Sequence, residues 1–199
     1  EEVSPSNAHP EYPRPQMVRP DWKNLNGLWE YSITPKNESC PESFEGKILV
    51  PFAVESSLSG VGRQFTSKDA LWYKTTFTVP SEWKNRRLML NFEAVDWRTD
   101  VFVNDVQVGT HTGGYTHFSF DVTPYLKKGT NTLVVKVQDS TDDNFQPRGK
   151  QVMNPNGIWY TPVSGIWQTV WLEPVAEAHI VDYLPVSDIH AGTIDIRVD

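Results

Sequence analysis

Acidic side chains offer the clearest potential for chemistry in this sequence. Two carboxyl groups can together hydrolyse a bond that lies between them, one acting as the acid and the other as nucleophile or base. The candidates between positions 93 and 143 are Glu93, Asp96, Asp100, Asp121, Asp139, Asp142 and Asp143. Several fall at expected strand ends or turns, where carboxylates commonly accept hydrogen bonds from backbone donors. We therefore expect structural roles for them and predict no catalytic residue in this chain.

Histidine and cysteine give weaker indications of a site. His111 and His117 flank the pair Gly113-Gly114, but their spacing matches no zinc pattern. No Lys-Ser/Thr follows the two glycines, as a phosphate-binding loop would require. Cys40 is the only cysteine, so it cannot form an internal disulfide, and no histidine near it in the sequence would activate its thiol. We expect no metal and no cofactor.

Tryptophan is the residue type in excess, with eight in 199 residues. Indole rings stack on the C–H faces of sugars, and the same amphipathic rings suit interfaces between domains. The tryptophans expected in strands, where a core or interface role is favoured, are Trp29, Trp72, Trp167 and Trp171. Trp97, Trp159 and Tyr160 fall at strand ends or in loops. With Asp96 they are the candidate carbohydrate-binding residues, and packing within the fold is the alternative role.

The elements that position these residues are predicted to be β-strands. Mainly apolar residues recur at every second position in residues 29–33, 73–79, 88–92, 133–137 and 166–172, with Thr75 and Gln168 as the polar exceptions. A period of two indicates strands with one face toward a core. Asn104-Asp105 between residues 101–103 and 106–108 predicts a hairpin, because both residue types tolerate the turn's positive φ. Helical signals are confined to single turns near residues 81–84 and 123–126, so the pattern predicts an all-β sandwich or barrel.

One long segment, residues 140–165, lacks this alternation. It contains Pro147, Gly149, Pro162 and the exposed-type aromatics Trp159 and Tyr160. Loops of more than about 20 residues are uncommon in compact domains and are usually functional. The aromatic side chains of this loop could anchor it to the domain, contact a ligand or contact a neighbouring domain.

The two ends of the chain differ from its centre. Residues 1–20 are rich in proline, which predicts an extended, weakly ordered tail that lies along a surface. Pro174 closes the last strand of the central domain, and alternation resumes before Asp199. We interpret residues 175–199 as the first strands of a second β domain. The first residue is Glu1 rather than Met, so we expect a fragment of a longer protein.

Charge and hydropathy restrict the partners. The formal net charge of −7 disfavours nucleic acids and acidic membrane surfaces, which are polyanionic. No apolar stretch approaches the roughly 20 residues of a membrane-spanning helix, and no signal peptide is recognisable. We therefore expect no nucleic-acid partner and no membrane insertion.

An ordered set of motifs resembles a known family. The stretches are LWYKTTFTVP at 71–80, LMLNFEAVD at 88–96, VFVNDVQVG at 101–109, GGYTHFSFDV at 113–122, NTLVVKV at 131–137 and SGIWQTVWL at 164–172. In this order they resemble the amino-terminal sugar-binding domain of glycoside hydrolase family 2, which contains β-galactosidases, β-glucuronidases and β-mannosidases. NLNGLW at 24–29 and VPF at 50–52 fit its opening strands.

The resemblance implies a domain organisation and a role. It implies a jelly-roll sandwich similar to galactose-binding domains over residues 21–174, followed by an immunoglobulin-like domain that begins within residues 175–199. A (β/α)8 barrel carrying the catalytic glutamates would come next, so this chain would be a non-catalytic part of a retaining β-glycosidase. Its partners would be a β-glycoside and the following domains. We expect an extracytoplasmic location in a bacterium.

The resemblance also identifies a departure from the family pattern. In some members an acidic residue shortly before the Ser-Gly-Ile segment helps to bind the sugar, but residues 157–163 read GIWYTPV and contain no carboxylate. Galactoside specificity is therefore not implied, and Trp159 or Tyr160 becomes a candidate stacking substitute. Two alternatives stay open: a free-standing carbohydrate-binding module and a purely structural or interaction domain.

Overall fold

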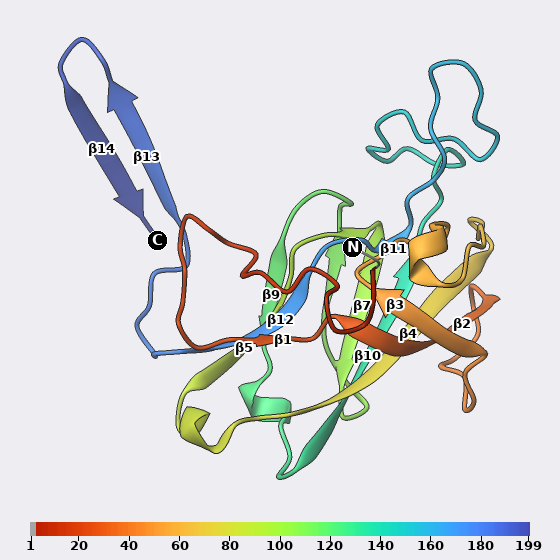
Figure 1. The fold of residues 1–199 in the computed structure, drawn as a ribbon, viewed down its shortest axis with the longest axis horizontal. Helices are drawn as coiled ribbons and strands as arrows, with labels where there is room; N and C mark the ends of the chain where they lie inside the picture. The colour runs from red at the N-terminus through yellow and green to blue at the C-terminus, as the bar shows by residue number, and fades with distance from the viewer. Residues whose placement is uncertain (1–2) are drawn as a thin grey trace.

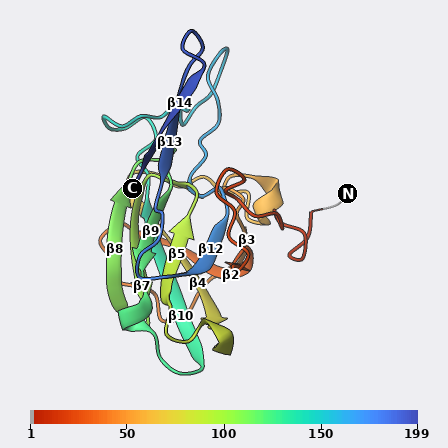
Figure 2. The same cartoon turned by 90° about the vertical axis from the view of Figure 1, so that its left-hand side faces the viewer.

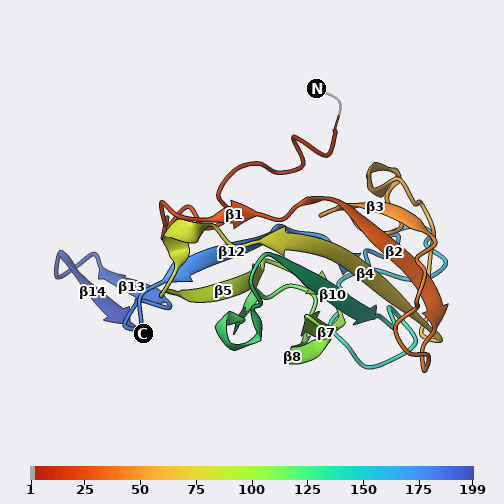
Figure 3. The same ribbon diagram turned by 90° about the horizontal axis from the view of Figure 1, so that it is seen from below.

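The chain folds into two antiparallel β-sheets that pack face to face, as the computed structural model shows for residues 3–199 (Figure 1). The four-stranded sheet has the order β1-β12-β5-β9, with β1 (Lys23–Asn24), β12 (Val170–Val175), β5 (Arg87–Phe92) and β9 (Phe118–Asp121). The six-stranded sheet has the order β3-β2-β4-β10-β7-β8, with β3 (Gly46–Val50), β2 (Gly27–Pro35), β4 (Asp69–Thr78), β10 (Thr130–Gln138), β7 (Arg98–Val103) and β8 (Val106–Thr112). Figure 3 shows the two layers edge on. The predicted all-β sandwich is confirmed, and its jelly-roll connectivity stays a prediction.

The remaining elements are short. β6 (Val95–Asp96) pairs with β11 (Gly165–Ile166), and β13 (Tyr183–Asp188) pairs with β14 (Thr193–Val198). The helical elements are single 3-10 turns: η1 (Ser57–Ser59), η2 (Ser81–Trp83) and η3 (Thr123–Tyr125). The turns expected near residues 81–84 and 123–126 are confirmed, whereas η1 was not predicted. No helix within residues 3–199 is long and apolar enough to cross a membrane.

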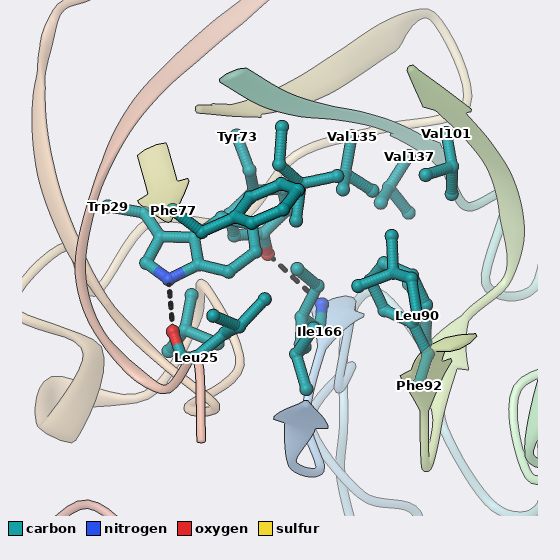
Figure 4. Packing of buried hydrophobic residues seen from close by; sticks show 14 of the residues in the cluster. Leu25, Trp29, Tyr73, Phe77, Leu90, Phe92, Val101, Val135, Val137 and Ile166 are labelled. Carbon is teal, nitrogen blue, oxygen red and sulfur yellow. Dashed lines mark hydrogen bonds between the residues drawn. The ribbon is translucent and has the colours of Figure 1, made fainter. Parts of the chain in front are cut away.

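Alternation along each strand builds the core between the sheets. Leu71, Tyr73 and Phe77 of β4 point inward and are buried, and Leu90 and Phe92 of β5 meet them from the other sheet (Figure 4). Burial of such side chains contributes roughly 1.5–3 kcal/mol each. The period-two pattern therefore has a direct physical cause, since every second side chain leaves water.

Large aromatic residues in this core keep their polar atoms satisfied. The Trp29 indole Nε1 donates to the carbonyl of Leu25 at 2.8 Å, and the backbone N–H of Ile166 donates to the Tyr73 hydroxyl at 3.1 Å (Figure 4). A buried polar atom without a partner would cost stability, so these two bonds allow wide rings at the centre of the sandwich. Burial of Trp29 agrees with its predicted core role.

The predicted hairpin between β7 and β8 is confirmed. Asn104 and Asp105 have φ values of 50° and 68°, the left-handed region that a tight two-residue turn needs. The strand predicted over residues 166–172 is broken instead. β11 pairs with β6 and β12 pairs with β5, so the chain changes partner between them, and Trp167 is only half-buried there. Alternation of apolar residues does not reveal such a change of partner, because both strands face the same core.

The amino-terminal segment lies along the four-stranded sheet. Asn24 Nδ2 donates to the carbonyl of His9 at 2.7 Å, and Asn26 Nδ2 donates to the carbonyl of Ala8 at 3.0 Å. Tyr12 donates a hydrogen bond to Glu173 on the outer face of β12. The segment therefore follows a surface through specific side-chain contacts.

The carboxyl-terminal hairpin β13–β14 extends away from the sandwich (Figures 1 and 2). Its apolar side chains are exposed, including Leu184, Val186, Ile194 and Ile196. Apolar side chains on both strands fit a hairpin whose faces pack against further structure. The assignment of residues 175–199 to the start of an immunoglobulin-like domain stays a prediction.

Candidate functional site

The long loop between β10 and β11, residues 139–164, projects from one end of the sandwich (Figure 1). It carries an aromatic lobe, which we define as residues 148–160. In this lobe the side chain of Trp159 is 41% exposed and that of Tyr160 is 64% exposed. The Arg148 guanidinium lies 5.9 Å from the centroid of the Trp159 ring, within the range of a cation–π contact. Two of the four predicted carbohydrate-binding residues therefore present ring surface to solvent.

Backbone hydrogen bonds give the lobe a defined shape. The N–H of Tyr160 donates to the carbonyl of Lys150 at 2.8 Å, and the N–H of Val152 donates to the carbonyl of Tyr160 at 3.0 Å. These bonds place Gln151 and Tyr160 in a short parallel bridge. The exposed rings are therefore carried on paired backbone.

Gln151 ties the lobe to the body of the domain. Its Oε1 accepts a hydrogen bond from the N–H of Val163 at 2.5 Å, and its Nε2 donates to the Tyr115 hydroxyl at 3.0 Å. The same Nε2 lies 3.5 Å from Oδ2 of Asp96 on β6. One buried amide thus joins the lobe, the end of the loop and the sandwich.

The neck of the loop, which we define as Glu55, Asp96, Asp139 and Ser164, closes its two ends. Asp139 accepts hydrogen bonds from the Ser164 hydroxyl at 2.7 Å and from Gln146 Nε2 at 2.6 Å. The N–H of Ser164 donates to Oε2 of Glu55 at 2.9 Å. Ser164 therefore connects two carboxyl groups that come from different parts of the sequence.

Asp96 lies beneath the loop and is only 2% exposed. A Cβ atom added to Gly114 would lie 2.5 Å from the Asp96 carboxyl carbon, so only glycine allows this approach. Burial raises the pKa of Asp96 to about 7, and the negative charge of Asp139 adds to the shift. The geometry thus gives Asp96 contact with the loop and no exposed surface for a ligand.

Trp97, the fourth predicted residue, is half-buried next to Asp96. Its backbone carbonyl accepts a hydrogen bond from the N–H of Gly113 at 3.1 Å, and its indole Nε1 is buried without a partner. The structure therefore groups Trp159 with Tyr160 in the lobe and places Asp96 and Trp97 in the body below. A carbohydrate-binding role for these four residues stays a prediction.

Of the other candidate carboxylates, four have hydrogen-bond partners, whereas Glu93 Oε2 is buried without one. Asp121 accepts hydrogen bonds from Arg87 Nε at 2.9 Å and from the N–H of Thr123 at 3.0 Å. Asp100 accepts a hydrogen bond from the Thr110 hydroxyl at 2.7 Å. Asp142 and Asp143 also make hydrogen bonds, to the N–H of Met153 and the hydroxyl of Ser67 respectively. Within the described part of the chain, no group of three or more His, Cys, Asp and Glu side chains could hold a metal ion.

The family model for "Glycosyl hydrolases family 2, sugar binding domain" matches residues 61–174. The chain belongs to this family. It is 33% identical over 185 residues to a β-galactosidase of Thermoanaerobacter pseudethanolicus, with 89% of this chain and 24% of that protein covered. It is 30% identical over 151 residues to a β-glucuronidase of Formosa agariphila, with 75% and 15% covered. This family 2 domain therefore spans about a quarter or less of the length of these relatives.

Solved structures agree on the fold. A β-glucuronidase from Ruminococcus gnavus in complex with C6-substituted uronic isofagomine superposes with a TM-score of 0.70 at 22% identity, covering 90% of this chain and 33% of that chain. This likeness shows a shared fold, and the family match fits an interaction of the domain with carbohydrate.

Sequence reasoning missed several residues that shape the site of this family 2 domain. Glu55, Tyr115, Gln151 and Ser164 all contact the loop or its neck, yet none stands out by type or spacing. Gln151 meets partners at positions 96, 115 and 163, which only the folded chain brings together. Asp139 was among the candidate carboxylates, and its role here is to hold the loop.

Proposed function

We propose that this family 2 domain is the accessory domain of a larger retaining β-glycosidase and that its aromatic lobe forms part of the wall of the sugar site. The observation that carries the proposal is the exposure of the Trp159 and Tyr160 rings on a loop that is tied down at its neck. Ring faces held in place suit stacking on the C–H face of a sugar at little cost in conformational entropy.

Catalysis on this proposal takes place in another domain of the same polypeptide. Two carboxyl groups next to the loop, Asp96 and Asp139, are 2% and 3% exposed and are engaged with it, and Asp142 accepts a hydrogen bond from the N–H of Met153 in the lobe. The relatives named above are at least about four times as long as the part that this chain matches, which leaves room for a catalytic barrel. The partners of the domain are then that barrel and a β-glycoside bound between them.

A free-standing carbohydrate-binding module is the alternative that the same exposed rings favour. The lobe would then bind sugar without a second wall. A site open on most sides gives weak binding, because most of the ligand surface remains in water. Sugar binding by the isolated chain as tight as that of the full-length protein would favour the module over the accessory domain.

The test is Trp159→Ala in the full-length protein. We expect KM for the natural β-glycoside to rise about tenfold with kcat little changed, because one lost aromatic contact of about 1.5 kcal/mol corresponds to roughly that factor. Leu28→Ala removes a comparably exposed apolar side chain outside the loop (54% against 41% for Trp159) and serves as the matched control. Unchanged kinetics for both Trp159→Ala and Tyr160→Ala would show that the lobe does not line the site.

A further inference from the structure

The neck of the loop gathers carboxyl groups without neutralising them. Glu55, Asp96 and Asp139 come from the segment after β3, from β6 and from the end of β10. Among the salt bridges of residues 3–199, none includes any of these carboxyl groups. Buried carboxylates without a paired cation are costly, so the neck must hold them by hydrogen bonds or by protonation.

Hydrogen bonds satisfy only one of the three carboxyl groups. Asp139 accepts from the N–H of Thr141 at 2.7 Å, from Gln146 and from Ser164, which is the environment an ionised carboxylate requires. Glu55 Oε1 and Asp96 Oδ1 are buried and have no hydrogen-bond partner. A buried carboxylate oxygen without a donor is costly, so the lack of donors favours the protonated form of Glu55 and Asp96.

The electrostatic surroundings act in the same direction. Burial raises the pKa of Glu55 to about 7 and that of Asp96 to about 7, and in both cases the charge of Asp139 opposes ionisation further. The other titratable groups facing the neck are the hydroxyl of Tyr73 on β4, whose pKa burial raises, and the hydroxyl of Tyr115 before β9.

Basic and histidine side chains lie further out. Arg148 stacks on Trp159 in the lobe and Lys150 is exposed there. His111 stacks on Phe118, and the charge of His117 acts on Glu93 rather than on the neck. The charge balance of the neck is therefore set by its own carboxyl groups.

The same groups hold the loop in place. Ser164 bonds to both Glu55 and Asp139, and Gln151 connects Asp96 to the lobe. Ionisation of Glu55 or Asp96 therefore changes the same hydrogen bonds that hold the aromatic lobe in place. Water entering to solvate a new carboxylate would compete for the same donors.

We propose that Glu55 and Asp96 form a proton-dependent latch for the loop of residues 139–164. With both carboxyl groups protonated, the neck stays closed and the aromatic lobe is held against the sandwich. When the protons are lost, three like charges share one buried neck, water enters, and the lobe is released. The consequence for sugar binding rests on the proposed function, whereas the latch itself is a property of this chain.

The sign of the pH dependence follows from linkage. The closed neck keeps protons that an open neck, with ordinary carboxyl pKa values of 4.5 and 3.8, has already released. The closed state is therefore favoured in full below about pH 4, and its advantage is lost as the pH rises through about 7. The loop should accordingly be tighter in mild acid than at pH 8.

The test is amide hydrogen exchange of this 199-residue chain between pH 5 and pH 8, corrected for intrinsic exchange rates. The reporters are the N–H groups of Thr141, Val163 and Ser164, which bond to neck or loop acceptors. We expect exchange of these amides to rise at least about tenfold over this range, while amides of β4 and β10 in the same samples do not change. Each pKa unit between closed and open states is a factor of ten in opening.

Amide variants separate the latch from a general effect of pH. Glu55→Gln with Asp96→Asn mimics the protonated pair, and we expect this double variant to keep the loop protected at every pH. The matched control is Glu93→Gln, which alters another buried, partnerless carboxyl oxygen with a raised pKa outside the neck and should leave the pH dependence intact. A wild-type loop whose exchange does not change with pH, or a double variant with the full pH dependence, would overturn the proposal. Neither readout involves sugar, so the proposed function is tested separately.

Discussion

At the scale of single residues, Asp139 shows how environment decides what a carboxylate does. Its type made it a candidate for chemistry, but its oxygens accept bonds from Thr141, Gln146 and Ser164. Each of these donors belongs to the long loop or to its end. A hydrogen-bond-accepting side chain at the end of β10 therefore helps to fix the geometry of the loop.

Ser164→Ala tests this reading of the neck. The substitution removes the hydroxyl that donates to Asp139 at 2.7 Å and leaves a buried carboxylate oxygen short of a donor. We expect the free energy of unfolding to fall by about 1–3 kcal/mol in chemical denaturation, with no change in the m-value.

The control is Ser119→Ala on β9, where the serine is exposed and a change below about 0.5 kcal/mol is expected. Equal and small effects of both substitutions would show that the Ser164 hydroxyl does not hold the neck.

Single residues were also the hardest to predict. Trp159 and Tyr160 were identified because a long loop with aromatic residues is unusual, and both are exposed as a binding role requires. Gln151 and Glu55 could not be identified, because their importance arises from partners such as Ser164 that lie more than ten residues away. Contacts of that kind exist only once the strands have fixed the ends of the loop.

At the scale of elements, the amino-terminal segment is organised around Glu173 on the outer face of β12. Glu173 is 2% exposed and accepts hydrogen bonds from Tyr12, Arg19 and the Trp171 indole. Arg19 also donates to the carbonyl of Ile180 at 2.7 Å, in the segment before β13. The amino-terminal segment therefore covers one sheet and at the same time holds the start of the carboxyl-terminal hairpin.

Arg19→Ala tests the importance of the ion pair between Arg19 and Glu173. The substitution leaves Glu173 buried without its cation, and breaking a buried ion pair costs about 3 kcal/mol. We expect a loss of that order in the free energy of unfolding.

The loss should be much smaller in a Glu173→Gln background, where no charge remains to be neutralised, and a double-mutant cycle measures the difference. The exposed pair Arg63 and Glu45 is the matched control, with less than about 1 kcal/mol expected for Arg63→Ala. Full additivity of the Arg19 and Glu173 changes would contradict the account.

Strands were predictable from the sequence where a period-two alternation of side chains runs along the whole strand. β2, β4, β5 and β10 appear where alternation predicted strands, because each buries one face in the same core, and β7 and β8 appear where the Asn104-Asp105 turn predicted a hairpin. The break at residues 167–169 and the short turn η1 were missed, since they depend on which strand pairs with which. The tail was predicted to lie along a surface, but the contacts that hold residues 3–20 there could not be predicted, because proline-rich chain has no period and its contacts include Glu173 on β12.

At the scale of the whole molecule, two projections leave the sandwich in different places. The loop of residues 139–164 carries exposed aromatic rings, and the hairpin β13–β14 carries exposed aliphatic side chains (Figure 1). Aromatic and aliphatic surfaces of this kind suit contacts with a ligand and with other domains respectively. We propose that the hairpin begins the next domain of the polypeptide and that the loop faces the catalytic one.

On the proposed function, the catalytic residues belong to another domain of the polypeptide. Near the lobe, Asp96 and Asp139 are buried and engaged with the loop, and the exposed Asp142 accepts a hydrogen bond from the N–H of Met153. Further away, the half-buried Asp121 is engaged with Arg87 and the N–H of Thr123. The proposed accessory role therefore predicts that activity requires the full-length protein and that this domain supplies part of its sugar site.

The most direct test of this central claim is hydrolysis of a panel of chromogenic β-glycosides by this 199-residue chain and by the full-length protein, measured side by side. We expect the full-length protein to cleave at least one glycoside and the 199-residue chain to cleave none at any concentration tested. Turnover by the 199-residue chain itself would contradict the account, because the carboxyl groups assigned here to the neck and the surface would then have to be catalytic.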